Sequence, residues 1–213
     1  DNPGFRECLK GCLALDYPSF EVIVVSDAAV AVPHEVRMIP TGAGRNTGPG
    51  EKRDIGMHVA TGSYLAFVDD DAIPRSDWLT RAVVLFSDSS IGAVAGPGIT
   101  PLHSAWRQRV GGAFYESWLG SGPYRYRFRP EAQREVDDYP AYNLVVRRSA
   151  AEQVNAWGTG RYAGGDTLMS LALFQAGWRI PYSASVGVYK QRRPRPRRRV
   201  APARVRVERA ELV

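Results

Sequence analysis

The sequence has 213 residues, 44% of them hydrophobic, and carries 28 Lys or Arg against 22 Asp or Glu, a net charge of +6. This length suits one domain with one sizeable core rather than two large domains. No apolar run reaches the length of about 18 residues needed to cross a bilayer, and no signal peptide is visible at the N-terminus, so we expect a cytoplasmic protein.

The chain opens with a predicted amphipathic helix. Asn2-Pro3 supplies a cap and a first-turn proline, and apolar residues follow at helical spacing. Cys8 and Cys12 share one face of this helix, where they make a poor disulfide and predict two small buried side chains. Residues 21–25 are a β-branched run typical of a strand covered on both faces, which ends at Ser26-Asp27.

A second helix and strand follow. A Gly- and Pro-rich loop over residues 41–50 leads into a predicted helix over 52–60, and residues 64–68 predict a strand that runs straight into three aspartates. Pro74 and Ser76 open another helix, and 91–95 is a further strand candidate. Alternating strands and helices predict an open, mainly parallel α/β sheet that binds ligands beyond the carboxyl ends of its strands.

The second half is less regular. Residues 103–140 are rich in Gly, Arg and aromatic side chains and predict a helix followed by a long functional loop. We expect a strand over 142–147, a helix over 166–175 and a weaker last strand over 180–189.

Positive charge is concentrated at the C-terminal end. Residues 190–213 contain ten Lys or Arg and two Glu, net +8, which leaves 18 basic and 20 acidic residues, net −2, in residues 1–189. Specific nucleic-acid binding needs basic residues over a folded face, which the body does not supply. We therefore divide the chain into a folded domain, 1–189, and a basic tail, 190–213, that we expect to be disordered and able to contact an anionic membrane surface.

Asp69-Asp70-Asp71 follows a predicted strand directly. Three adjacent carboxylates repel one another unless a cation or solvent relieves the repulsion. Mg²⁺ and Mn²⁺ bind oxygen ligands, commonly one or two carboxylates plus substrate phosphates, so Asp69 and Asp71 could hold such an ion against a diphosphate. The alternative is an acidic turn that caps the next helix.

Four segments together resemble family 2 glycosyltransferases, which have the GT-A fold. Residues 67–74, FVDDDAIP, resemble the DxD region of that family, and 21–27, EVIVVSD, its second strand with the nucleoside-contacting acid. Residues 50–56, GEKRDIG, resemble its G-x-K-R-N-x-G helix start, and 164–167, GGDT, its G-E-D-T segment. The motifs occur in the family's order across residues 3–193, so their joint specificity is high.

The resemblance implies inverting transfer of a sugar from a nucleotide-sugar donor to a hydroxyl of a saccharide or lipid-linked acceptor, assisted by Mn²⁺ or Mg²⁺. It implies that Asp27 contacts the base, Asp69 the ribose or metal, Asp71 the metal and diphosphate, and that Asp166 is the catalytic base. A helix N-cap is the alternative role of Asp166. The expected donor-binding residues are Asp27, Lys52, Arg53, Asp69 and Asp70, and the expected metal ligands are Asp69 and Asp71.

Two of these assignments have structural alternatives. Lys52 and Arg53 could steer the diphosphate or form a solvated helix face. Aromatic residues between 103 and 140 could line an acceptor groove, because sugars stack on aromatic rings, or belong to the core. These aromatic candidates are Trp106, Tyr115, Trp118, Tyr124 and Tyr126.

The sequence also departs from the family pattern. The first strand expected before the first helix is absent, Gly165 replaces a Glu, and Asp54 replaces an Asn. Lys190 stands where many relatives carry a metal-binding histidine. These departures leave open a degenerate domain that binds nucleotide or a partner but transfers little. A GT-A-like nucleotidyltransferase is a third hypothesis, from the glycine-rich residues 42–45, although that signature should follow the first strand directly.

Overall fold

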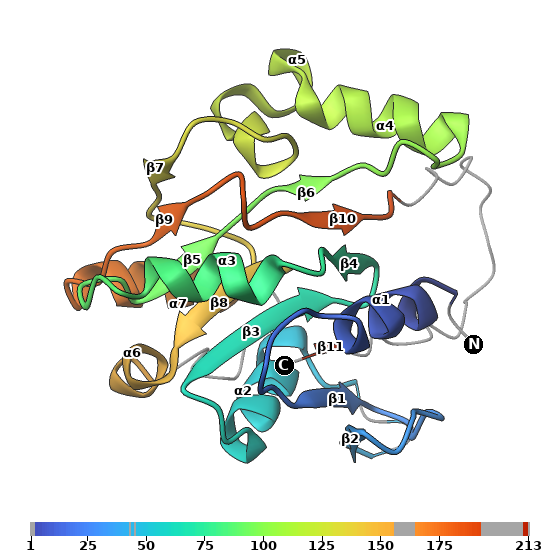
Figure 1. Ribbon diagram of the computed structural model, residues 1–213, viewed down its shortest axis with the longest axis vertical. Helices are drawn as coiled ribbons and strands as arrows, with labels where there is room; N and C mark the ends of the chain where they lie inside the picture. Colours follow the sequence, from blue (N-terminus) through green and yellow to red (C-terminus); the bar gives the residue numbers. More distant parts are fainter. Residues whose placement is uncertain (1–2, 43, 45, 156–164, 193–210, 213) are drawn as a thin grey trace.

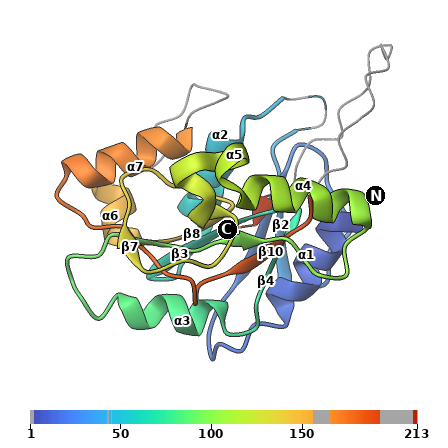
Figure 2. The same cartoon turned by 90° about the horizontal axis from the view of Figure 1, so that it is seen from above.

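The computed structural model describes residues 3–42, 44, 46–155, 165–192 and 211–212. Strands in this part of the chain form a main sheet, in the order β2-β1-β11-β3-β8-β5-β9-β7, and a small sheet, β4-β10-β6. Figure 1 shows the elements, and Figure 2 shows α1 and α3 on one side of the main sheet with α2, α6 and α7 on the other. The α/β architecture predicted from the sequence is confirmed.

The predicted helices are present with small shifts at their ends. The helices are α1 (Pro3–Leu13), α2 (Pro49–Val59), α3 (Trp78–Leu85), α4 (Trp106–Glu116), α5 (Trp118–Ser121), the 3-10 helix η1 (Gly122–Arg127), α6 (Arg148–Gln153) and α7 (Gly165–Gln175). Both cysteines of α1 are buried and free, as predicted. No helix in the described ranges is long and apolar enough to span a bilayer.

The strands differ more from the sequence prediction. They are β1 (Val22–Ser26), β2 (Val36–Pro40), β3 (Tyr64–Asp69), β4 (Ala72–Pro74), β5 (Ala93–Ala95), β6 (Gly98–Ile99), β7 (Arg134–Glu135), β8 (Asn143–Arg147), β9 (Pro181–Tyr182), β10 (Val188–Lys190) and β11 (Glu211–Leu212). The sequence prediction missed β2, which is parallel to β1. Its residues, VRMIP, lack the apolar run that identified β1.

The main sheet is mixed, so the prediction of a mainly parallel sheet is wrong in this respect. Strand β8 is antiparallel to both β3 and β5. Its first residue, Asn143, pairs with Val68 near the end of β3. After α4, α5 and η1, the chain therefore enters β8 at the edge of the sheet where β3 ends. Strand β8 consequently runs in the direction opposite to β3.

The position between β1 and β3 is filled from the C-terminal end of the chain. Strand β11 pairs antiparallel with both neighbours, Leu212 with Val24 and Glu211 with Asp69. The expectation of a disordered tail is therefore wrong for residues 211–212 and for Lys190 in β10, while residues 193–210 and 213 lie outside the described residues. Near the amino ends of β1 and β3, a cavity of about 570 Å³ is lined by Glu21, Tyr64 and Leu79 among others.

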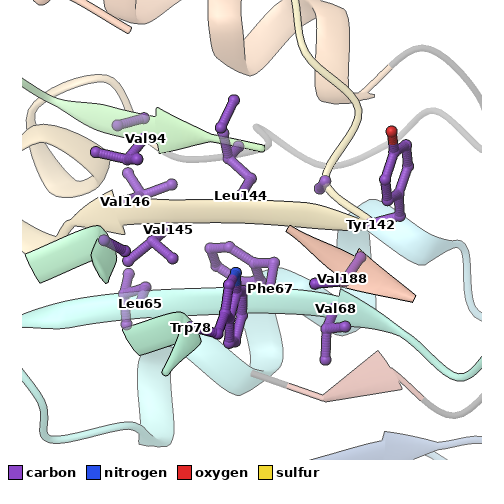
Figure 3. Close-up of a cluster of buried hydrophobic side chains, with 14 of the residues drawn as sticks. Leu65, Phe67, Val68, Trp78, Val94, Tyr142, Leu144, Val145, Val146 and Val188 are labelled. Atoms are coloured by element: carbon purple, nitrogen blue, oxygen red, sulfur yellow. The ribbon is translucent and has the colours of Figure 1, made fainter. Parts of the chain in front are cut away.

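Buried hydrophobic side chains of β3, β5, β8 and α3 pack together in the core (Figure 3). Trp78 of α3 donates an indole hydrogen bond to Asn143 Oδ1 at 2.8 Å, and Asn143 Nδ2 donates to the carbonyls of Gly96 and Val186, both at 2.7 Å. A Cβ on Gly96 would lie 1.7 Å from the Val186 carbonyl oxygen. The chain after β5 and the chain before β10 thus meet at fully buried Asn143.

The single strand predicted over residues 180–189 is split. Strand β9 belongs to the main sheet, and β10 belongs to the small sheet. Strand β10 runs antiparallel to β4, with Lys190 paired with Ala72. Because Asp71 precedes Ala72, this register brings Lys190 from the end of the domain to the aspartate triplet.

Candidate functional site

Asp27 follows β1 and is held by polar groups from the next loop. Its Oδ1 accepts a hydrogen bond from Thr41 Oγ1 at 2.7 Å, and its Oδ2 accepts one from the Thr47 amide at 3.4 Å. Lys52 Nζ lies 3.4 Å from Oδ1. Burial alone would raise the pKa of Asp27, but these hydrogen bonds and the Lys52 charge outweigh it and hold the pKa below its usual value.

Lys52 and Arg53 lie near the start of α2 with only 3% and 6% of their surface exposed. The alternative of a solvated helix face is therefore wrong. Charged side chains stay buried only when they are paired, and each of these has a carboxylate partner. Lys52 contacts Asp27, and Arg53 reaches across to α7.

Arg53 links two of the predicted site residues. Its Nη1 donates a hydrogen bond to Asp166 Oδ1 at 2.6 Å, and its Nη2 lies 3.5 Å from Asp69 Oδ1. The other Asp166 oxygen accepts the Ala141 amide at 3.0 Å. Asp166 is thus fixed by groups from outside its own helix, while 28% of its side chain remains exposed. Residues 113 positions apart in the sequence meet here.

Lys190 lies between the outer two aspartates of the triplet. Its ammonium donates hydrogen bonds to Asp69 Oδ2 at 2.5 Å and Asp71 Oδ1 at 2.6 Å. The ring centroid of Tyr142 is 4.8 Å from the same nitrogen. Burial alone would lower the pKa of Lys190, but the two carboxylates outweigh it and raise the pKa, so the ammonium stays charged.

The middle aspartate has a different environment. Asp70 is 3% exposed, and its charge acts on the Cys8 thiol of α1. Hydrogen bonding to Cys12 and burial raise the pKa of that thiol, and the charge of Asp70 adds to the effect. The Cys8 thiol itself donates to the Asp69 carbonyl oxygen at 3.4 Å, so α1 packs against the start of the triplet, and the contact of Asp70 with a donor stays a prediction.

The structure thus brings Asp27, Asp69, Asp71 and Asp166 to the carboxyl-end edge of the sheet, together with the buried cations Lys52 and Arg53 and the largely buried Lys190. A known family matches this chain. The model for glycosyl transferase family 2 matches residues 2–154. The chain belongs to glycosyl transferase family 2.

Similar proteins agree with this family. The pre-mycofactocin glycosyltransferase of Mycobacterium tuberculosis is 29% identical over 136 residues, which are 63% of this chain and 28% of that protein. The structure of S. aureus TarS in complex with UDP-GlcNAc has a TM-score of 0.62 at 16% identity over 89% of this chain. The mannosyltransferase PcManGT of Pyrobaculum calidifontis, in complex with GDP-Man and Mn²⁺, has a TM-score of 0.60 at 17% identity over 93%.

These similarities show the fold, which is the GT-A fold that the sequence predicts. The chain spans 28% of the mycobacterial relative and 55% of each of the two solved chains. It therefore corresponds to between 28% and 55% of the length of these three proteins.

The family resemblance predicted a divalent metal at Asp69 and Asp71, and the side chains present do not fit one. Both carboxylates already bind the Lys190 ammonium. Among the described residues, no three His, Cys, Asp or Glu side chains are grouped to hold an ion. Lys190, which replaces the expected histidine, therefore does more than remove a metal ligand. Its positive charge lies between the carboxylates of Asp69 and Asp71.

Several residues of this site are not recognisable from the sequence. Thr41 and Thr47 bind Asp27 from a loop that the sequence identified only as rich in Gly and Pro. Tyr142 was predicted as part of a strand, but its ring lies against Lys190. Neither kind of contact has a local signal, because each joins residues that lie far apart in the sequence.

The aromatic candidates for an acceptor groove separate by exposure. Tyr126 is 6% exposed and stacks edge-on against Tyr182 at 5.1 Å between ring centroids, so it belongs to the core. The other four are partly or largely exposed on α4, α5 and η1. They are Trp106 (69%), Tyr115 (38%), Trp118 (65%) and Tyr124 (53%).

Proposed function

We propose that this domain transfers a sugar from a nucleotide-sugar donor to an acceptor hydroxyl with inversion at the sugar carbon. The observation that carries the proposal is Arg53, which joins Asp69 after β3 to Asp166 at the start of α7. A donor-binding carboxylate and a candidate base are thereby linked by one cation. The family membership and the relatives named as glycosyltransferases support the same reaction class.

The donor's nucleoside would lie beside Asp27. Its carboxylate is kept ionised by Thr41, Thr47 and Lys52, so it can accept hydrogen bonds from a base. UDP-GlcNAc and GDP-Man, the donors bound by two proteins of this fold, are the first candidates. Asp69 would contact the ribose. Asp70 is proposed as a further donor-binding residue.

Asp166 would act as the general base. It takes the proton from the acceptor hydroxyl while that oxygen forms a bond to the sugar carbon from the face opposite the leaving group. The bond from this carbon to the phosphate oxygen breaks, and the nucleoside diphosphate leaves with the electron pair. A carboxylate at hydrogen-bond distance contributes about 10²- to 10⁴-fold to such a step.

The leaving diphosphate gains negative charge and needs a cation. Mn²⁺ is present in the PcManGT complex, and Mn²⁺ or Mg²⁺ is what the family resemblance implies. Because Asp69 and Asp71 are occupied by Lys190 here, we assign diphosphate binding to the chain's own cations Lys190 and Arg53.

The acceptor is proposed to be a saccharide or a lipid-linked saccharide at an anionic membrane surface. Trp106, Val110, Phe114 and Trp118 follow one another at intervals of four residues, and each is at least 42% exposed. Residues 97–115 contain Arg but no Asp or Glu. Trp106, Val110 and Phe114 lie on α4 and Trp118 begins α5, and exposed aromatic residues beside basic ones favour an interface between lipid and water. The basic tail, which we expect to add to this attraction, lies largely outside the described residues.

The membrane proposal is tested by sedimentation with phosphatidylglycerol and phosphatidylcholine vesicles. The double change Trp106→Ser and Trp118→Ser should reduce binding to the anionic vesicles, and Val84→Ser, a 67% exposed apolar residue on α3, is the matched control. Equal sedimentation of all three proteins with both lipids contradicts the proposal.

The transfer proposal is tested by a screen of nucleotide sugars for release of nucleoside diphosphate, with and without Mn²⁺. We expect one donor class to be hydrolysed slowly, and Asp27→Asn to abolish this. Binding without hydrolysis or transfer to any acceptor would favour the degenerate domain. Pyrophosphate release from a nucleoside triphosphate and a sugar phosphate would favour the nucleotidyltransferase.

A further inference from the structure

We propose that the Lys190 ammonium replaces the divalent ion of this site, so that donor binding is independent of metal. Lys190 would neutralise Asp69 and Asp71 and donate its remaining hydrogen bond to the donor diphosphate. This inference rests on the proposed function, because it names the group that meets the leaving phosphate.

The sheet register fixes the position of the ammonium. Strand β10 is hydrogen-bonded between β4 and β6, and Lys190 pairs with Ala72, which directly follows Asp71. The Gln191 amide donates to the Asp71 carbonyl at 2.8 Å, so the backbone beyond Lys190 is attached to the triplet as well. The lysine reaches the carboxylates from a strand in the small sheet and not from a free loop.

Lys190 packs closely against Tyr142 and Gly98. The Tyr142 ring lies 4.8 Å from Nζ on one side, and a Cβ added to Gly98 would lie 3.4 Å from Lys190 Cβ and 2.7 Å from the Tyr142 ring. The lysine side chain is 14% exposed, and those of Asp69 and Asp71 are 15% and 16% exposed. The three charged groups are therefore largely shielded from water. Ion pairs are stronger in such an environment than in water.

A lysine and a divalent ion cannot share this position. Mg²⁺ would need its carboxylate oxygens at about 2.1 Å, and the same oxygens lie 2.5 and 2.6 Å from Nζ. An incoming ion would have to break both ion pairs and then face a displaced ammonium of like charge. Both the loss of the two ion pairs and the repulsion between like charges therefore oppose metal binding.

The ammonium can still serve the donor. It has three N–H donors, and Asp69 and Asp71 accept two of them. The third would be donated to a diphosphate oxygen of the bound donor. A second fixed cation lies nearby on the same segment, since Arg192 donates to the Gly98 carbonyl at 2.6 Å and to Thr100 Oγ1 at 3.2 Å. Preorganised charges of this kind stabilise a leaving group without reorganising during the reaction.

The experiment compares wild-type protein, Lys190→Ala and Lys190→His in two titrations. The first follows Mn²⁺ binding alone by electron paramagnetic resonance. The second follows UDP and GDP binding by calorimetry, in EDTA and in excess Mn²⁺. Lys10→Ala, which removes a 75% exposed lysine paired with Glu7, is the matched control. Circular dichroism confirms that each variant is folded, and Lys190→His provides the test if Lys190→Ala does not fold.

We expect wild-type protein to bind no Mn²⁺ at this site and to bind nucleotide equally in both buffers. Lys190→Ala should lose about tenfold in nucleotide affinity in EDTA, the loss expected for one hydrogen bond to a charged group. Both Lys190 variants should acquire Mn²⁺ binding, and Mn²⁺ should restore their nucleotide affinity. Lys10→Ala should behave as wild type.

Wild-type protein that binds Mn²⁺ in a manner lost in Asp71→Asn, or that binds nucleotide only with Mn²⁺, would overturn the role of Lys190 and leave the proposed transfer intact. If neither nucleotide binds wild-type protein in either buffer, the donor site is wrong. The Mn²⁺ titration would then still decide whether Lys190 holds the cation position.

Discussion

Asp166→Asn separates a catalytic base from a structural carboxylate. The change removes the charge and replaces one oxygen by an NH₂ group, while Asp166 now accepts hydrogen bonds from Arg53 at 2.6 Å and from the Ala141 amide at 3.0 Å. An asparagine can accept only one of these through its remaining oxygen. One hydrogen bond is therefore lost, and the Arg53 bond is the stronger of the two because both of its partners are charged.

The cost in stability is modest. A hydrogen bond to a charged group contributes about 1.5–3 kcal/mol, and partial exposure of Asp166 favours the lower end of this range. In a domain of this size each kcal/mol corresponds to about 2–4 °C in Tm, so we expect Tm to fall by about 5 °C. Native domains have about 5–15 kcal/mol of stability, so nearly all of the variant remains folded at 25 °C and instability cannot reduce the rate appreciably.

The expected loss of transfer is much larger, about 10²- to 10⁴-fold, because the neutral amide cannot take the acceptor proton. Initial rates at saturating donor and acceptor measure this, and calorimetry should show nucleotide binding close to that of the parent. Asp88→Asn is the control. It removes an exposed carboxylate that lies away from the site and pairs with Arg179 at an N–O distance of 2.7 Å. Transfer by Asp166→Asn at the rate of Asp88→Asn would show that Asp166 is not the base.

Further predictions concern donor binding and the support of the site. The pKa of Asp27 is lower in the folded than in the unfolded protein, so the stabilisation that Asp27 contributes is present above its unfolded pKa of about 4 and is lost as pH falls through the folded pKa. Urea unfolding between about pH 6 and pH 3 should therefore show a smaller loss of stability on acidification in Asp27→Asn than in the parent. An equal loss in the two proteins would contradict this. Gly96→Ala places a Cβ 1.7 Å from a backbone oxygen and should unfold at much lower urea. Gly111→Ala on α4 should be neutral or stabilising, because its Cβ would meet no atom within 4 Å beyond the local helix backbone and the adjacent residues. Asn143→Ala should lower the free energy of unfolding by about 3 kcal/mol, because it leaves buried donors and acceptors without partners; a loss no larger than that of an exposed Asn, such as Asn46→Ala, would count against this.

Local patterns in the sequence were sufficient for the helices and for the strands with strong apolar runs. Strands β1 and β3 are recognisable because they are covered on both faces, and the aspartates at their ends then fall at one edge of the sheet. The direction of β8 and the division of 180–189 into β9 and β10 depend on pairing with distant strands. No local periodicity encodes such pairing.

The site shows the same limit. The motifs identified Asp27, Asp69, Asp71 and Asp166 as candidates, and the structure places these four residues at one edge of the sheet. The sequence did not predict that Lys190 pairs with the aspartate triplet. Lys190 is 121 residues from Asp69 and 119 from Asp71, so the sequence showed only that an expected histidine was absent. Its role depends on the register between β10 and β4.

Hydrogen–deuterium exchange with UDP-GlcNAc or GDP-Man tests whether the donor binds at the aspartate edge of the sheet. We predict slower exchange in the loop and helix start over residues 41–53 and in the turn over residues 69–71. We predict unchanged exchange around the cavity of about 570 Å³ near Glu21 and Tyr64, at the opposite ends of β1 and β3. Protection confined to that cavity, with the aspartate edge unchanged by either nucleotide sugar, would contradict the account.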